Sequence, residues 1–141
     1  MLFACSKKEE AKPGSSPEET ARLRNRLNKI FYWQIADELK LSPQEEAQMV
    51  KVLEDFQVRK EKSLINRRGA LDAIEAACEE GSTSASESKQ LITDYRKSMK
   101  ADVDVDMNQI EALEKIMGPQ RLLRFLKSRS EMSDKIRQVI R

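Results

Sequence analysis

The sequence predicts an all-α protein: an elongated four-helix arrangement that contains a long antiparallel helical hairpin. The 141 residues include only 4 glycines and 4 prolines, so few positions can interrupt a helix. Hydrophobic residues make up 39% and charged residues 35% of the chain, which is typical of long helices that share narrow apolar seams. Apolar residues recur at helical spacing over residues 21–141, which we expect to form a single all-helical domain.

Residues 1–20 differ from the remainder of the chain. They are polar, contain Pro, Gly and Ser, and lack an apolar period, so they are expected to form a flexible tether. The stretch "LFAC" is similar to the end of a bacterial lipoprotein signal, in which Cys5 would receive the lipid. The second cysteine, Cys78, is expected to be a small buried residue, and the two do not suggest a disulfide framework.

The first helix is expected over about 17–40. Ser16 is a suitable N-cap, Pro17 suits the first helical position, and Glu19 completes a capping box. The aromatic run Phe31, Tyr32 and Trp33 lies beside or on its apolar stripe. This run either packs against two neighbouring helices or forms an exposed contact patch for a partner.

The second helix is expected over about 43–79, because Ser42, Pro43 and Glu45 repeat the same start signal. Its apolar stripe is Val50, Leu53, Leu64, Leu71, Ile74 and Cys78, with spacings that suit a heptad seam. Polar residues interrupt the seam at Gln57, Lys60 and Arg67. The basic residues of this region form either a solvated face or a surface that mixes apolar and basic groups; they are Arg59, Lys60, Lys62, Arg67 and Arg68.

"GSTSAS" at 81–86 is the clear interior loop. The third helix is expected from about 86 to 117, antiparallel to the second. Its apolar stripe is Ile92, Tyr95, Met99, Val103, Met107, Ile110, Leu113 and Met117. "DVDVD" at 102–106 lacks the Gly and Glu that a calcium-binding loop needs at its sixth and twelfth positions, so it is expected to be helical.

The fourth helix is expected to follow Gly118. Residues 119–141 contain seven Lys/Arg and two Asp/Glu, and such a basic amphipathic helix can bind a membrane surface or an acidic partner. It can also dock on the hairpin, which carries an excess of acidic residues. We expect docking on the hairpin.

The composition excludes several classes of chemistry. The chain has no histidine, which removes the commonest general base and the commonest transition-metal ligand. It also has no phosphate-binding glycine loop and no Cys-x-x-Cys pair. We therefore expect no enzyme, cofactor or metal site. A net charge of +2 gives no field for nucleic acid.

Two short stretches are alike: "LSPQE" and "MGPQR" each have an apolar residue, Ser or Gly, and then Pro-Gln. They comprise Leu41, Ser42, Pro43, Gln44 and Glu45, and Met117, Gly118, Pro119, Gln120 and Arg121. With the lipoprotein-like start and the helical hairpin, they resemble the Spy/CpxP-like periplasmic proteins, which have a repeated Leu-Thr-x-x-Gln motif. Leu41 and Ser42 match with Ser for Thr, whereas Glu45 and Arg121 occupy the glutamine positions.

The resemblance implies a curved, cradle-like helical dimer in the periplasm whose concave face holds unfolded clients. The family also includes inhibitors of envelope-stress sensors and metal-responsive relatives; the latter rely on histidine, which this chain lacks. We expect a non-enzymatic chaperone or stress modulator that contacts membranes only through a lipid anchor. The candidate contact residues are Phe31, Tyr32, Trp33, Arg59, Lys62, Arg67 and Arg68. The alternative is an adaptor lipoprotein that recognises one dedicated partner.

Overall fold

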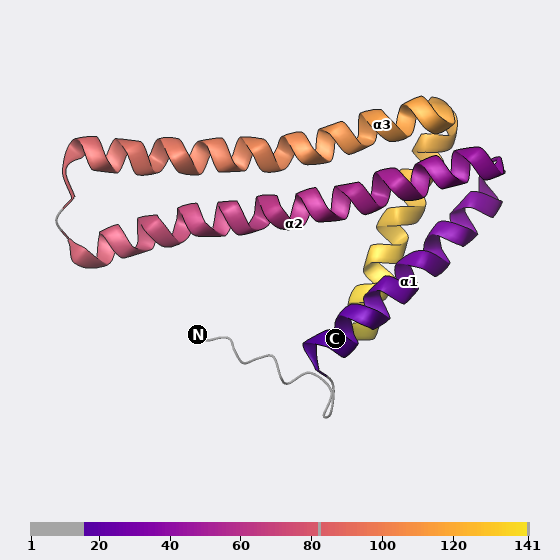
Figure 1. Ribbon diagram of the computed structural model, residues 1–141, viewed down its shortest axis with the longest axis horizontal. Coiled ribbons are helices and arrows are strands. Elements are labelled where there is room, and N and C mark those ends of the chain that lie inside the picture. The colour runs from indigo at the N-terminus through magenta and orange to yellow at the C-terminus, as the bar shows by residue number, and fades with distance from the viewer. Residues whose placement is uncertain (1–15, 82, 141) are drawn as a thin grey trace. The chain divides into compact units, whose positions relative to one another are not determined.

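The computed structural model describes residues 16–81 and 83–140, and it is all-helical there (Figure 1). Its three helices are α1 (Pro17–Glu38), α2 (Pro43–Glu80) and α3 (Ala85–Ile140), and the described residues contain no strand. The prediction of an all-α protein is therefore confirmed. The described chain divides into two compact units. Residues 16–46 and 117–140 form the terminal unit, and residues 47–116 form the central unit.

Each helix begins with a reciprocal serine–glutamate capping box. The serine hydroxyl accepts a hydrogen bond from the glutamate N–H, and the glutamate carboxylate accepts one from the serine N–H, at 2.9–3.1 Å. Two backbone donors without a helical partner are thereby satisfied at each start. The pairs are Ser16 with Glu19, Ser42 with Glu45, and Ser84 with Glu87.

A tight turn separates α1 from α2 in the terminal unit. Lys40 adopts the left-handed conformation with φ 57. Its N–H donates to the carbonyl of Asp37 at 3.2 Å, and the N–H of Leu41 donates to the carbonyl of Ala36 at 2.9 Å. This is the Schellman arrangement, with lysine at the position that glycine usually occupies.

The core of the terminal unit joins α1 to the last part of α3. Phe31, Ile35 and Leu39 are buried on α1, and Leu122 and Phe125 are buried on α3. The rings of Phe31 and Phe125 lie 6.0 Å apart between centroids, within the range of favourable aromatic pairs. One side of α1 is thus buried from Phe31 onward.

The break expected at Gly118 is a kink within α3. Gly118 has φ 81 and ψ 166, and Pro119 follows it inside the helix. This combination of angles is available essentially only to glycine, and proline has no N–H to donate to the preceding turn. The segment expected as a fourth helix therefore corresponds to the last part of α3.

In the central unit, α2 and α3 lie side by side and run in opposite directions (Figure 1). Met49, Leu53 and Leu113 are buried towards one end, and three polar residues, Ser63, Asp102 and Gln109, are buried along the unit. When half-buried residues are included, the inward positions repeat at three and four residues, as at Leu53, Phe56, Lys60 and Ser63, which is the spacing of a coiled-coil seam.

The apolar stripe predicted for α3 is only partly right: Leu113 and Met117 are buried and Tyr95 is half-buried, but four other members are exposed. Ile92, Met99, Val103 and Met107 are 55%, 40%, 55% and 59% exposed. Beside Met99 and Val103 the inward positions are taken by the preceding residues, Ser98 and Asp102, about 100° around the helix. The buried Asp102 suits this position because Lys60 and Arg67 of α2 pair with it across the seam. Cys78, expected to be buried, is also exposed.

Candidate functional site

An open hollow lies between α2 and α3 of the central unit. Its volume is about 170 Å³, and it is lined by Val52, Asp55, Phe56, Arg59, Val105, Asn108, Gln109 and Ala112. Binding sites for small molecules usually measure about 300–1,000 Å³, so the hollow is too small for a typical cofactor. The hollow has room for about one side chain of a partner, whose apolar part could contact Val52, Phe56 and Val105.

Charged side chains surround this hollow and the shallower depression that adjoins it. The adjoining depression shares Val52 and Arg59 with the hollow and adds Lys51, Glu111 and Lys115. Among the described residues, none of Lys51, Arg59 and Lys115 forms an ion pair. The hollow and the depression therefore combine apolar side chains with three cations and two carboxylates, Asp55 and Glu111, so that the cations are in excess by one.

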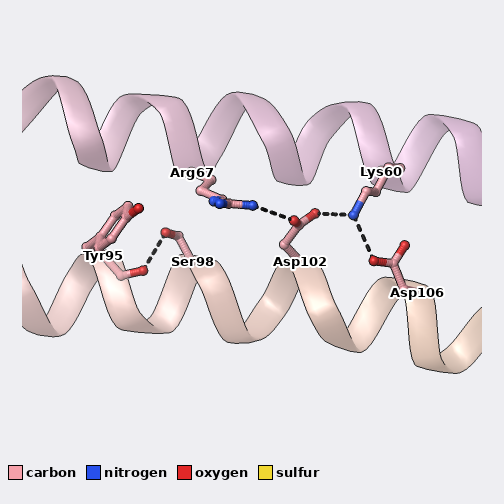
Figure 2. A network of polar contacts seen from close by, with 6 residues as sticks. All are labelled: Lys60, Arg67, Tyr95, Ser98, Asp102 and Asp106. Atoms are coloured by element: carbon pink, nitrogen blue, oxygen red, sulfur yellow. Dashed lines mark hydrogen bonds and ion pairs between the residues drawn. The ribbon is translucent and has the colours of Figure 1, made fainter. Parts of the chain in front are cut away.

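A polar network fills the centre of the seam, as Figure 2 shows. The ammonium of Lys60 lies 2.8 Å from Oδ1 of Asp102 and 2.9 Å from Oδ2 of Asp106. The guanidinium of Arg67 lies 3.1 Å from Oδ2 of Asp102. The Asp102 side chain is only 5% exposed, so this carboxylate pairs with both cations inside the contact between the helices.

The network stabilises the charged form of its members. The hydrogen bond from Lys60 lowers the pKa of Asp102 below its ordinary 3.8, although burial acts in the opposite direction. For Lys60, burial lowers the pKa, but hydrogen bonds to Asp102 and Asp106 outweigh burial and raise the pKa above its ordinary 10.5. Both groups therefore remain charged at neutral pH, and the network is structural in character.

The two Pro-Gln stretches are joined directly through their fifth residues. The guanidinium of Arg121 makes two parallel hydrogen bonds with the Glu45 carboxylate, Nη1 to Oε1 at 3.2 Å and Nη2 to Oε2 at 2.9 Å. The Nε of Arg121 also donates to the carbonyl of Met117 at 2.8 Å. Such bidentate pairs fix geometry as well as contributing energy. Arginine at this position is therefore explained by its partner rather than by the dipole of its own helix.

The Glu45 carboxylate accepts hydrogen bonds both from the start of its own helix and from α3. Its Oε1 accepts from the N–H of Ser42 at 2.9 Å and from Arg121. The hydrogen bonds from Arg121, and then from the Ser42 backbone, lower the pKa of Glu45 from 4.5 to about 2. A single carboxylate thus begins α2 and connects it to α3 within the terminal unit.

The three aromatic candidates have different environments. Phe31 is buried against Phe125, and Tyr32 is half-buried with its ring edge towards Phe31 at 6.1 Å between centroids. Trp33 is 68% exposed. Of the three rings, only Trp33 has most of its surface free for a partner. The expectation of packing therefore holds for Phe31 and Tyr32, and the expectation of exposure holds for Trp33.

The four basic candidates also divide. Arg67 pairs with Asp102 in the seam, and Arg68 pairs with Asp72 and Glu75 on its own helix. Arg59 and Lys62 are exposed. Neither forms an ion pair with any residue that the structure describes. The structure therefore brings Arg59 to the hollow and leaves Lys62 exposed one helical turn further along α2.

Sequence reasoning identified the interruptions of the α2 seam at Lys60 and Arg67 but missed their partner, Asp102. The available signal was the acidic run "DVDVD", because its first residue falls on the same side of the helix as Tyr95 and Leu113. That position could have indicated a carboxylate facing the two cations. Sequence reasoning also missed the pairing of Glu45 with Arg121. The only signal for this pair was that the fifth residue is acidic in the first stretch and basic in the second.

Cys5, the predicted lipidation site, lies outside the described residues. Across residues 16–81 and 83–140, no helix is both long and apolar enough to cross a membrane. In the same ranges no group of three or more His, Cys, Asp or Glu side chains is placed to hold a metal ion.

Comparison with known proteins gives no relative from which a function could be transferred. No family model, curated protein or solved structure matches the chain.

Proposed function

We propose that this chain is a non-enzymatic binding protein that holds unfolded or partner proteins on the helical surface of its central unit. The observation that carries this proposal is the hollow at Val52 and Phe56, with the unpaired cation Arg59 at its edge. Unfolded chains expose apolar side chains and carboxylates together. A surface that mixes shallow apolar recesses with mobile charges suits weak contacts with many sequences.

The location and the assembly are parts of the same proposal. The resemblance of the two Pro-Gln stretches to the Spy/CpxP-like family supports a periplasmic protein, and "LFAC" supports lipidation at Cys5. The family architecture, in which a helical hairpin forms a curved dimer, is supported by apolar side chains of α3 that are exposed in the described structure. Ile92, Met99, Val103 and Met107 lie on one side of that helix, each at least 40% exposed.

The test is suppression of the aggregation of an unrelated, thermally unfolding protein. Wild-type chain at equimolar concentration should reduce aggregation, and Arg59→Glu should weaken the effect because it repels client carboxylates from the hollow. Lys89→Glu is the matched control, because Lys89 is an exposed cation on α3 that does not line the hollow. Unchanged aggregation with the wild-type chain would refute the chaperone activity.

Capture from an envelope extract distinguishes a chaperone from an adaptor. Many weakly held proteins, lost together in the Arg59→Glu variant, are the outcome for a chaperone. One stoichiometric partner retained through washing would instead support the adaptor lipoprotein.

A further inference from the structure

The outer face of α1 has a composition that the proposed function does not use. We define this face by Arg22, Arg26, Lys29, Ile30 and Trp33, which fall on one side of the helix at 100° per residue. All five are exposed, with Ile30 at 43% and Trp33 at 68%. They point away from the side that carries Phe31 and Ile35 into the core of the terminal unit.

The middle of this face is basic. The residues between 20 and 36 include Arg22, Arg24, Arg26 and Lys29 but no Asp or Glu, whereas the exposed Glu18 and Asp37 lie on the same side of α1 at its two ends. Within the described part of the chain, Arg22, Arg26 and Lys29 form no ion pair. The exposed Lys100, by contrast, is paired with Asp104 one turn away. The outer face therefore presents three unpaired cations between Glu18 and Asp37.

We infer that the outer face of α1 binds the surface of a membrane that contains anionic phospholipids. Lysine and arginine near an anionic membrane surface are attracted to its headgroups, which strengthens binding by about fivefold for each cation. Tryptophan favours the boundary between headgroups and acyl chains, because its ring is apolar and its N–H donates a hydrogen bond. Ile30 adds apolar area at the same boundary.

The mixture of groups identifies the partner. An acidic protein surface would attract the three cations, but it would accommodate the exposed indole of Trp33 only with an apolar pocket placed beside its carboxylates. A lipid surface accommodates both, with phosphates for Arg22, Arg26 and Lys29 and the interface for Trp33. The site is on the terminal unit, so it goes beyond the protein-binding surface proposed on the central unit.

The test uses the full chain without lipid at Cys5. Trp33 is the only tryptophan, so its fluorescence reports on this face alone. Titration with vesicles of phosphatidylglycerol and phosphatidylcholine in equal parts should shift the emission to the blue, and salt should weaken the binding. Vesicles of phosphatidylcholine alone should produce no shift.

Two triple variants separate this face from general charge effects. Replacing Arg22, Arg26 and Lys29 with glutamine should weaken binding by about 100-fold, at roughly fivefold for each cation. The control replaces Lys89, Arg96 and Lys97, exposed cations of α3, with glutamine, and its binding should equal that of the wild type. Circular dichroism of both variants confirms that helicity is retained.

Three outcomes would overturn the inference. The first is an unchanged Trp33 emission with anionic vesicles, and the second is an equal loss of binding in the two triple variants. The third is binding to soluble polyglutamate without binding to vesicles, which would assign the face to an acidic protein. The aggregation assay reports on the central unit separately, so its failure leaves this result unaffected.

Discussion

Replacing Asp102 with asparagine should lower the free energy of unfolding by about 2 kcal/mol, whereas the same substitution at Asp104 should change it by less than about 0.5 kcal/mol. Asparagine preserves the size of the side chain but removes its charge. Lys60 and Arg67 would then lose the carboxylate that they share at 2.8 Å and 3.1 Å. Asp104 lies two residues away in the same acidic run.

The size of this loss in stability depends on how far each charged group is hydrated once the ion pair is removed. Breaking a fully buried ion pair costs about 3–5 kcal/mol. Here the Asp102 side chain is 5% exposed, but Lys60 and Arg67 are 25% and 41% exposed, so the two cations regain part of their hydration and the cost falls to about 1–3 kcal/mol. The control pair, Lys100 with Asp104, is 80% and 52% exposed, which is the class of surface pair that contributes little.

The assay is unfolding by heat and by urea, followed by circular dichroism. For a chain of this size, about 2 kcal/mol corresponds to a fall in Tm of roughly 5–10 °C. Asp104→Asn should unfold within about a degree or two of the wild type. Equal midpoints for the two variants, or a more stable Asp102→Asn, would show that the seam network does not stabilise the central unit.

Three further predictions concern the terminal unit and the helices. Gly118→Ala should destabilise the chain by about 1–3 kcal/mol, since φ 81 and ψ 166 strain any other residue. Gly69→Ala, with open space around the added Cβ, should stabilise α2 by about 0.5–1 kcal/mol, so thermal melts should shift in opposite directions. Arg121→Gln should lower the Tm by several degrees, whereas Arg124→Gln should leave it unchanged. In a double-mutant cycle, adding Glu45→Gln to Arg121→Gln should cause little further loss of stability. The pKa of Glu45 is lowered to about 2. Its stabilising contribution is therefore complete above about pH 4.5, and it is lost as the pH falls to about 2. Acid unfolding of Arg121→Gln should show a correspondingly shallower loss of stability, and an unchanged acid profile would contradict this role.

The helix starts could be predicted because their determinants are local. Ser16, Pro17 and Glu19 lie within a few residues of one another, so the bonds that form the capping box are visible in the sequence. The same reasoning placed the start of α2 at Pro43 and the break at Gly118. These signals depend on backbone groups that every helix leaves unsatisfied, whatever the helix packs against.

The seam of α3 could not be predicted from apolar periodicity. The chain offers two stripes one residue apart: the apolar stripe through Met99 and Val103, and a more polar stripe through Ser98 and Asp102. Periodicity favours the first, because burial of an unpaired carboxylate would be costly. The second is buried because Lys60 and Arg67 on another helix remove that cost, and their position relative to Asp102 depends on the alignment of two helices.

The need to align α2 with α3 in one register explains why polar residues lie in this seam. A fully apolar seam of similar shape would often be at least as stable, but its repeats would resemble one another and the helices could slide by seven residues. Lys60 and Arg67 are one such repeat apart, and Asp102 bonds both. After a slide by one repeat, Asp102 could face only one of them, and the other cation would lose its carboxylate.

We therefore infer that Asp102 fixes the register of α2 against α3, and the Asp102→Asn variant tests this separately from stability. Spin labels at Glu61 and Lys100, both exposed, would be placed in a chain whose own cysteines are replaced by serine. The wild-type background should give one distance, and the variant should add a second population from the shifted register. A single distance shared by both would show that the apolar end at Leu53 and Leu113 sets the register without the carboxylate.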